Sequence, residues 1–336
     1  MWLRRGIWIL IGFTFLLIVW GGMVRRSGSG LGCPDWPLCY GQAVPPMESA
    51  AWIEFTHRLL AGLVGLLTLG LTVVTWCKTA LRQRFGWWML VAMFLVIAQA
   101  LLGGVTVKTE LHPLIVAAHL ALAFLFFGVV MVLSPRCARG PAGSIMINGG
   151  WCRSGDPHER QQPQAMPRMG VTDDRTRQPL NEPVRGEGLT AGSAMVRFLG
   201  GLAVLVLFTQ ILIGGLVSGY QAGLACPDFP TCQGQWWPPF VGLVAIQMSH
   251  RIGAIITLFL VGGFLIAAIR HPAFRLLRGH LWGTVFLLAL QIALGIGNVL
   301  WSLPFAVDVA HLAIAVALFG ALVVAVTHDR TRAEMS

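Results

Sequence analysis

Eight long apolar runs constrain this sequence more than any other feature. Each has the length of about 20 residues that an α-helix needs to cross the hydrocarbon core of a bilayer. The runs cover residues 6–24, 52–76, 87–107, 113–133, 195–217, 241–269, 281–301 and 307–327. Only 11% of the 336 residues are charged, whereas a soluble domain carries about 25%. The sequence therefore predicts an all-α polytopic membrane protein with eight transmembrane helices, and it excludes a water-soluble enzyme, a secreted disulfide scaffold and a disordered chain.

The positions of the basic residues predict how the chain crosses the membrane. If the N-terminus is cytoplasmic, 19 of the 24 Lys and Arg residues fall on the cytoplasmic side, and the outside segments hold Arg25, Arg26 and Lys108. The positive-inside rule describes this distribution. We therefore expect a protein of the cell's inner (cytoplasmic) membrane with both termini in the cytoplasm. The net charge of +10 follows from these loops, so the expected surroundings are a lipid bilayer and not nucleic acid.

The chain contains an internal repeat. Residues 21–46 read GGMVRRSGSGLGCPDWPLCYGQAVPP, and residues 214–239 read GGLVSGYQAGLACPDFPTCQGQWWPP. Two cysteines and a histidine recur after 193 residues, and a histidine and a glutamine recur after 192: Cys33 and Cys226, Cys39 and Cys232, His57 and His250, His119 and His311, and Gln99 and Gln291. An even number of spans separates the two copies, so both run in the same direction. We expect two four-helix bundles, residues 1–133 and 195–336, related by a pseudo-two-fold axis along the membrane normal.

Residues 134–194 join the two predicted bundles. The segment is rich in Pro, Gly and Arg and has no sustained periodicity. A chain of this composition buries too little apolar surface to fold by itself. We therefore expect a mostly disordered cytoplasmic linker, with a regulatory or partner-binding tail as the alternative.

Four histidines inside the predicted spans are the candidate metal ligands. His57, His119, His250 and His311 each lie a few residues from the outer end of a span, which places them roughly 10 Å below the outer surface. Ionisable residues inside a membrane are costly and mark functional sites. Opposed imidazoles on antiparallel helices suit the two axial positions of a haem iron, and no C-x-x-C-H motif indicates covalent attachment. A single such histidine could equally be a hydrogen-bonding core residue, but two repeated pairs favour the ligand role.

Two other kinds of metal site stay open at this point. Glu54-x-x-His57 and Asp308-x-x-His311 place an acid and a histidine on one helical face, as in di-metal carboxylate sites, although those use about four carboxylates. Zinc would need more ligands than one pair of histidines supplies. Small residues near the histidines could let a flat macrocycle approach the backbone or could serve helix packing: Gly62, Gly65, Gly253 and Ala254.

One acid distinguishes the two halves. Glu54 lies one helical turn before the first of the four histidines, whereas Gln247 stands at that position in the second half. We therefore interpret the first half as the place of proton chemistry and Glu54 as the candidate catalytic residue, with a carboxylate stabilised by the helix dipole as the alternative. Arg58 and Arg251 directly follow their histidines and are candidates to pair with haem propionates or with lipid headgroups.

Two cysteine pairs lie in loops that the predicted topology places outside the cytoplasm, where thiols can oxidise. Cys33 with Cys39, and Cys226 with Cys232, can each close a short disulfide loop. For the second pair we favour a structural role. For the first pair, beside the acid, a structural staple and a thiol relay stay equally open.

The motifs of the two halves together resemble one known family. The patterns GG-x-x-R-x-x-x-SGLGCPDWP-x-C-x-G, then E-x-x-HR, then LGG-x-TV followed by AHL, are similar to those of the haem A synthase family of bacteria and mitochondria. The resemblance covers nearly all of both halves but not residues 134–194. It implies an eight-helix membrane enzyme that oxidises the C8 methyl of haem O to a formyl group, giving haem A for cytochrome oxidase.

The resemblance also implies roles for individual side chains. His57 and His119 would hold the substrate haem O, and His250 and His311 would hold a haem b cofactor. Glu54 would act in catalysis as a proton acceptor or as a stabiliser of positive charge. The first cysteine pair would serve haem transfer or redox chemistry, and the second would be structural. The implied partners are haem O synthase, cytochrome oxidase assembly factors and an electron acceptor that the sequence does not identify.

Three other functions each fit part of the sequence. A diheme b-type membrane electron-transfer protein would carry two equivalent haems and would not need Glu54. A haem transporter would move haem between the two halves. A thiol oxidoreductase would use the cysteine pairs without any haem.

Overall fold

The computed structural model describes residues 2–137, 144–147, 150–153 and 186–333. Within these residues it contains eight helices that are long and apolar enough to cross a membrane. Their bounds are α1 Trp2–Arg26, α2 Ser49–Cys77, α3 Thr79–Lys108, α4 Pro113–Cys137, α5 Gly186–Gly219, α6 Gly242–Arg270, α7 Arg278–Leu300 and α8 Phe305–Ala333. Each of the eight predicted apolar runs coincides with one helix, so the predicted all-α membrane architecture is confirmed. Most of the helices extend past the apolar runs at one or both ends.

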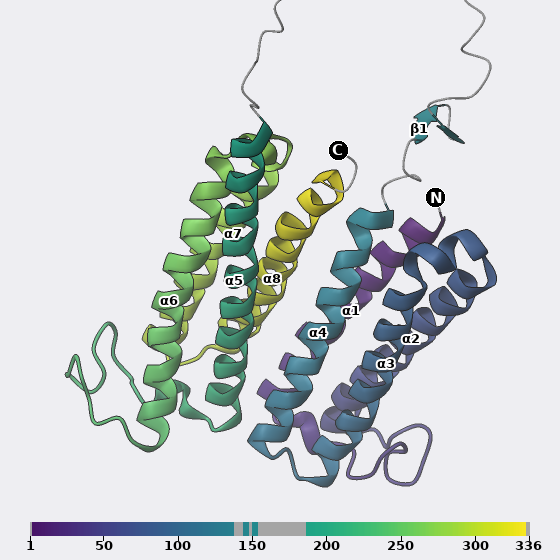
Figure 1. The fold of residues 1–336 in the computed structure, drawn as a ribbon. Helices are drawn as coiled ribbons and strands as arrows, with labels where there is room; N and C mark the ends of the chain where they lie inside the picture. Colours follow the sequence, from purple (N-terminus) through teal and green to yellow (C-terminus); the bar gives the residue numbers. More distant parts are fainter. Residues whose placement is uncertain (1, 138–143, 148–149, 154–185, 334–336) are drawn as a thin grey trace, which may run out of the picture.

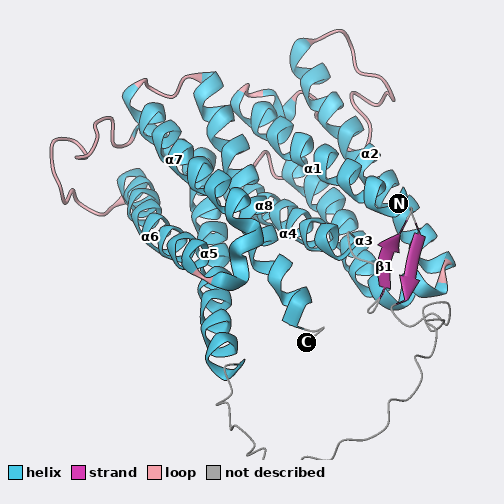
Figure 2. Cartoon of the chain, turned by 90° about the horizontal axis from the view of Figure 1, so that it is seen from above, coloured by secondary structure: helices cyan, strands magenta, loops and turns pink. Residues whose placement is uncertain are grey.

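The helices form two side-by-side groups, α1–α4 and α5–α8 (Figure 1). Both chain ends lie at the same end of the molecule as β1, and the two long loops that follow α1 and α5 lie at the opposite end. Viewed along the helices, α4 and α8 lie between α2 and α3 on one side and α6 and α7 on the other (Figure 2). Helices α1 and α4 contact α8, and α4 also contacts α5, so these four helices join the groups.

The connection between the groups is more ordered at its ends than the sequence predicts. Helix α4 continues to Cys137, and α5 already begins at Gly186. Between them, β1 (Ser144–Ile147) and β2 (Gly150–Arg153) pair antiparallel. The rest of the predicted linker lies outside the described residues.

The core between the two groups is built on aromatic side chains of α4 and α8. Phe124 and Phe319 pack edge to face with ring centroids 5.3 Å apart, a geometry that aromatic pairs prefer. Two glycines at matching places bring the helices close together. A Cβ on Gly128 would lie 3.4 Å from Phe319, and one on Gly320 would lie 3.1 Å from Phe127. Close packing of this kind holds helices together where lipid gives no hydrophobic driving force.

Two arginines at the end of α1 add polar contacts across the same boundary. Arg25 donates to the carbonyl oxygens of Ser218 (3.1 Å) and Gly219 (2.8 Å) at the end of α5. Arg26 lies 3.2 Å from the carboxylate of Asp308 at the start of α8. Both arginines are therefore engaged by the second half of the chain.

Gly200 on α5 gives a direct test of the packing. A Cβ there would lie 2.7 Å from Val326 on α8 and 2.8 Å from Phe264 on α6. We expect Gly200→Ala to lower the free energy of unfolding in detergent by about 1–3 kcal/mol, the usual cost of overpacking. Its neighbour Gly201 has no atom within 4 Å of such a Cβ, so Gly201→Ala is the matched control. Equal stability of the two variants would contradict this packing.

Candidate functional site

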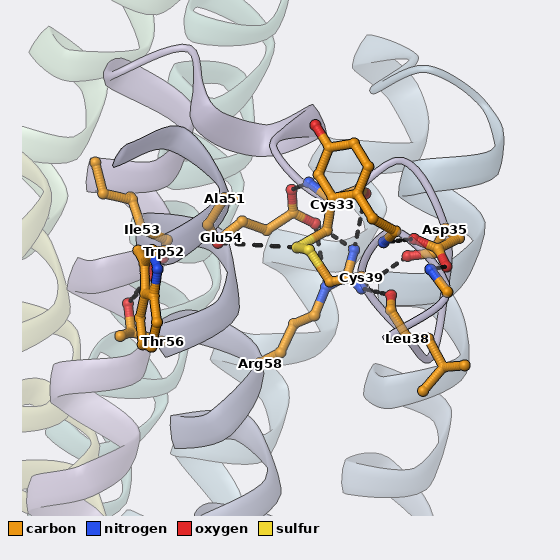
Figure 3. Close-up of a disulfide and its surroundings, with 12 residues drawn as sticks. Cys33, Asp35, Leu38, Cys39, Ala51, Trp52, Ile53, Glu54, Thr56 and Arg58 are labelled. Atoms are coloured by element: carbon orange, nitrogen blue, oxygen red, sulfur yellow. Dashed lines mark hydrogen bonds and ion pairs between the residues drawn. A yellow bond between two sulfur atoms is a disulfide. The ribbon is translucent and has the colours of Figure 1, made fainter. Parts of the chain in front are cut away.

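Each of the two long loops is closed by a disulfide. Cys33 is bonded to Cys39 in the first loop, and Cys226 to Cys232 in the second. All four cysteines are buried. The second cysteine of each pair exchanges two backbone hydrogen bonds with a glutamine three residues on, Gln42 or Gln235. The two predicted disulfides are therefore present in the structure, and Figure 3 shows the first with its surroundings.

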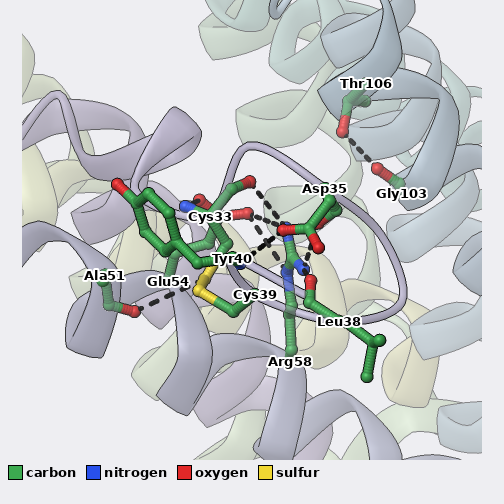
Figure 4. A network of polar contacts seen from close by, with 10 residues as sticks. All are labelled: Cys33, Asp35, Leu38, Cys39, Tyr40, Ala51, Glu54, Arg58, Gly103 and Thr106. Atoms are coloured by element: carbon green, nitrogen blue, oxygen red, sulfur yellow. Dashed lines mark hydrogen bonds and ion pairs between the residues drawn. A yellow bond between two sulfur atoms is a disulfide. The ribbon is translucent and has the colours of Figure 1, made fainter. Parts of the chain in front are cut away.

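Arg58 fastens the first loop to helix α2. Its guanidinium donates to the carbonyl oxygens of Asp35 (2.7 Å), Leu38 (2.8 Å) and Cys33 (3.1 Å) (Figure 4). Three carbonyl acceptors, together with Glu54, occupy the donors that the sequence made candidates for a haem propionate or a lipid headgroup. The propionate contact of Arg58 stays a prediction, and the contact present is with the protein's own loop.

Arg251 repeats this arrangement on helix α6. It donates to the carbonyl oxygens of Thr231 (2.7 Å), Cys226 (2.8 Å) and Asp228 (2.8 Å). These are the positions 193 residues after the three acceptors of Arg58. The arginine that follows each histidine thus ties a disulfide loop to the helix that carries the histidine.

Glu54 points toward the first loop (Figure 3). Its side chain is buried, with 4% of the residue exposed. One carboxylate oxygen accepts a hydrogen bond of 2.8 Å from the backbone N–H of Cys33, and the other accepts from Arg58, with the Nε at 3.1 Å. Charge-assisted bonds of this kind stabilise an ionised carboxylate inside the protein. The acid therefore connects the disulfide loop to the turn of α2 that precedes His57.

Gln247 takes the place of this acid in the second half. It is equally buried, with 4% exposed. Its amide donates to the carbonyl oxygen of Gly223 at 3.2 Å, and its own oxygen has no hydrogen-bond partner among the described residues. The second half keeps the arginine and the disulfide loop but has no carboxylate at this position.

The four histidines form two pairs. His57 on α2 lies within electrostatic range of His119 on α4, and His250 on α6 lies within the same range of His311 on α8. Each imidazole is partly buried. The predicted facing of the histidines within each half is consistent with this placement.

Each histidine ring rests on a glycine of a neighbouring helix. A Cβ on Gly21 of α1 would lie 3.1 Å from Cε1 of His57, and one on Gly103 of α3 would lie 3.2 Å from Cε1 of His119. In the second half, Gly214 of α5 and Gly295 of α7 meet Cε1 of their histidines, His250 and His311, at 3.0 Å and 3.1 Å. These distances are tighter than ordinary van der Waals contact, so no larger residue fits without moving the ring.

Glutamine amides contact three of the four rings. The amide nitrogen of Gln99 lies 3.1 Å from Nε2 of His119, and that of Gln291 lies 3.2 Å from Nε2 of His311. Gln210 approaches the remaining held ring, with its amide nitrogen 2.9 Å from Nδ1 of His250. A neutral imidazole carries one N–H and one lone pair, and an amide can partner either of them.

The contacts of the four glycines with the histidines, and that of Gln210 with His250, were not predicted from the sequence. Gly21 and Gly214 begin the repeated GG motif, and Gly103 and Gly295 each follow a leucine at matching positions of the two halves, so the repeat could have identified them. The small residues named instead have other surroundings. A Cβ on Gly62 or Gly65 would meet no atom within 4 Å, and Gly253 faces the side chain of Gln210.

The histidine pairs fit a haem better than they fit a bare metal ion. The Nδ1 atoms of His57, His119 and His311 are buried without a hydrogen-bond partner among the described residues. A buried ring nitrogen without a partner is costly unless a ligand takes it. A haem iron needs only two axial ligands because the macrocycle supplies the others. In the part of the chain that the structure describes, no group of three or more His, Cys, Asp or Glu side chains is placed to hold a metal ion.

An aspartate caps each disulfide loop and makes the loop sensitive to acid. Asp35 accepts a hydrogen bond from the backbone N–H of Tyr40 at 2.6 Å (Figure 4) and another from that of Gly41 at 2.7 Å. The bond from Gly41 is the main cause that lowers the pKa of Asp35. Asp228 accepts from the hydroxyl of Thr231 and from the N–H groups of Gly234 and Gln233, which together lower its pKa to about 2.

The lowered pKa of Asp228 predicts when the second loop loosens. A carboxyl whose folded pKa lies below its unfolded value stabilises the fold fully above the unfolded pKa and loses that effect as the pH falls through the folded pKa. We expect hydrogen-exchange protection of the Gln233 and Gly234 amides to hold at about pH 5 and to fall as the pH approaches about 2. Asp228→Asn should remove this pH dependence. Protection that is unchanged down to about pH 1 would contradict the assignment.

Comparison with known proteins agrees with this geometry. The model of the COX15-CtaA family, described as cytochrome oxidase assembly protein, matches residues 4–150 and 176–323. A protein of Shewanella oneidensis named Heme A synthase is 30% identical, over 92% of this chain and 90% of its own length. Proteins of the same name from Bacillus licheniformis (27% identical, 95% of this chain, 93% of the relative) and Symbiobacterium thermophilum (28%, 91% and 89%) are similar over comparable lengths. The chain therefore belongs to the COX15-CtaA family of cytochrome oxidase assembly proteins.

Proposed function

We propose that this chain is a haem A synthase, a membrane oxidoreductase that converts the C8 methyl of haem O to the formyl group of haem A for cytochrome oxidase. Its relatives over almost the whole chain are named Heme A synthase, so it is an enzyme with a haem-related substrate and cofactor. The observation that carries the proposal is the combination of two repeated histidine pairs with an acid, Glu54, in only one of the two halves. A protein with two equivalent haems would have no need of this difference.

The first half is the substrate half in this proposal. His57 and His119 hold haem O, and His250 and His311 hold haem b. The assignment rests on Glu54, which is buried beside the first pair, while its counterpart Gln247 cannot carry a charge. A haem b cofactor supplies one-electron transfer when it is bound.

Glu54 is the residue that serves the reaction at the methyl group. Oxidation of the methyl to a geminal diol by way of a carbocation would take up two water molecules and release four protons and four electrons, and the electrons would pass to the electron acceptor. The diol would then lose one water to give the formyl group. Positive charge would develop at the reacting carbon as the electrons leave. A buried carboxylate stabilises that charge and accepts a proton released there. The N–H of Cys33 and the guanidinium of Arg58 both donate to this carboxylate and hold it in position. The first disulfide loop therefore acts at least as a support for the catalytic acid.

The proposed orientation places both termini in the cytoplasm and both disulfide loops outside it, in the cell membrane. The excess of basic residues at the end that carries the termini supports this, as do two disulfides at the opposite end. A pseudo-two-fold relation of the halves is supported by contacts between corresponding helices, α1 with α8 and α5 with α4. The proposed partners are haem O synthase, which supplies the substrate, cytochrome oxidase assembly factors, which receive the product, and an electron acceptor.

Pigment analysis tests the function. We expect haem A to appear in membranes when the chain is expressed together with a source of haem O, in a host that otherwise makes none. The extracted haems are separated by chromatography. A protein that binds haem b while haem O accumulates unchanged would contradict the proposal and would favour the diheme electron-transfer protein or the haem transporter.

Glu54→Gln tests the role of the acid. The change copies the residue of the second half and keeps the size of the side chain. We expect conversion of haem O to fall by about 100-fold or more, the usual scale for loss of a proton-transferring group, while both haems stay bound. Glu48→Gln is the matched control, because Glu48 is exposed just before α2 and its side chain makes no capping hydrogen bond. Conversion at the wild-type rate in Glu54→Gln would show that the carboxylate is dispensable.

A further inference from the structure

Three of the four histidines are held by the same short pattern on a neighbouring helix. A glutamine and a glycine stand four residues apart, as Gln99 and Gly103 on α3, Gln210 and Gly214 on α5, and Gln291 and Gly295 on α7. Residues four apart lie one above the other on a helix. The glycine therefore meets the ring at Cε1 while the glutamine amide reaches a ring nitrogen. Each of these imidazoles is held at two points.

His57 is the exception. The corresponding helix, α1, carries Gly21 against Cε1 of His57, but the position four residues before it is Leu17. Among the described residues no hydrogen bond reaches either ring nitrogen of His57, and its Nδ1 is buried without a partner. This imidazole is therefore held at one point only.

The two halves also differ at the residue that the Gln210 side chain packs against. In the second half the amide oxygen of Gln210 occupies the space that a Cβ on Gly253 would need, so the glycine makes room for the glutamine. The corresponding residue of the first half is Leu60. The pair Gln210 and Gly253 is thus replaced by two leucines, Leu17 and Leu60. The first half therefore differs from the second at both positions of this contact, and not only at the position of the glutamine.

The contrast is greatest between His250 and His57, which are counterparts in the repeat. The amide of Gln210 lies 2.9 Å from Nδ1 of His250 and also donates to the carbonyl oxygen of the same residue at 2.8 Å. These contacts limit rotation of the His250 ring about its side-chain bonds. Without them, the ring of His57 can turn about its side-chain bonds at lower cost.

We propose that His57 is the exchangeable ligand of the pair that holds the substrate haem, and that Gln210, Gln99 and Gln291 are positioning residues that keep the other three ligands in place. This inference rests on the proposed function, since it assigns the passing haem to the half with the released ligand. A cofactor that stays needs two fixed ligands, whereas a substrate that enters and leaves as product needs one that lets go. Release of His57 also frees an axial position next to the helix that carries Glu54.

Transfer of haem to excess apomyoglobin tests the inference. The purified protein, loaded with haem O and haem b, is mixed with apomyoglobin, and the haem that remains is extracted and separated by type. We expect haem O to leave faster than haem b by about fivefold or more, which corresponds to one net hydrogen bond of about 1 kcal/mol. Carbon monoxide, which binds reduced iron only where an axial ligand leaves, should shift the spectrum of haem O and not that of haem b.

Two reciprocal double variants exchange the features of the halves. Leu17→Gln with Leu60→Gly should slow the loss of haem O and suppress its carbon monoxide shift, and Leu60→Gly alone is the matched control because it opens the space without adding an amide. Gln210→Leu with Gly253→Leu should speed the loss of haem b by about fivefold and make it reactive to carbon monoxide. The second variant stays informative if the first fails to fold.

Unchanged haem loss in both folded double variants would overturn the inference, as would equal loss from the two halves of the wild-type protein. A failure of the proposed function is recognised separately. If the extract holds haem b and never haem O or haem A, the proposed function is wrong. The rates of haem b loss from each half, and their response to the double variants, then still decide whether His57 is the weakly held ligand.

Discussion

The structure depends on placing imidazoles inside a membrane, where every polar atom needs a partner. The fold meets this need by bringing helices so close together that each ring lies against the backbone of a neighbour. Four glycines make that approach possible: Gly21, Gly103, Gly214 and Gly295. A Cβ added to any of them would lie only 3.0–3.2 Å from the histidine ring. The rings are thereby directed toward their partners in the same half, and their remaining nitrogens are left for a ligand. The four glycines and the four histidines therefore form matched pairs, in which each glycine makes room for one ring.

Hydrogen bonds join the disulfide loops to the helices that carry His57 and His250. Arg58 and Arg251 each bind three loop carbonyls while standing directly after a histidine. The same loop geometry therefore serves both halves. In the first half it also holds Glu54 through the N–H of Cys33. The same support thus carries an acid in one copy and a neutral amide in the other.

Much of this could be predicted from the sequence, because lipid leaves a chain few options. The apolar runs predicted the helices, and the repeat predicted the histidine pairs, the cysteine pairs and the difference between Glu54 and Gln247. The direction of the side chains was harder to predict. The helices are apolar all round, so the sequence does not say which face packs against a neighbour. For that reason the sequence left Gly62 and Gly65 open between approach of a macrocycle and helix packing, and the structure shows open space beside both, with no atom within 4 Å of an added Cβ.

Comparison of the two copies showed the difference between Glu54 and Gln247 but not the difference between Leu17 and Gln210. Gln99 and Gln291 occupy the same position in the two halves, so the repeat identified both. Gln210 corresponds to Leu17. A residue that occurs in only one half is not found by looking for what the halves share. Arg58 was considered a partner for haem propionates or lipid headgroups because arginine suits such anions, and the structure adds contacts with backbone carbonyls of its own loop. The contact of Gln210 depends on how two helices face each other, and the contacts of Arg58 depend on how a loop folds back over a helix. Spacing along the chain determines neither.

The central claim is that each half of the chain binds its own haem through its own pair of histidines. The haem composition of two purified variants, His119→Ala and His311→Ala, tests it most directly when both are made in cells that contain haem O and haem b. The account predicts that His119→Ala loses haem O and keeps haem b, and that His311→Ala loses haem b and keeps haem O. Loss of the same haem from both variants would show that the four histidines do not form two separate sites.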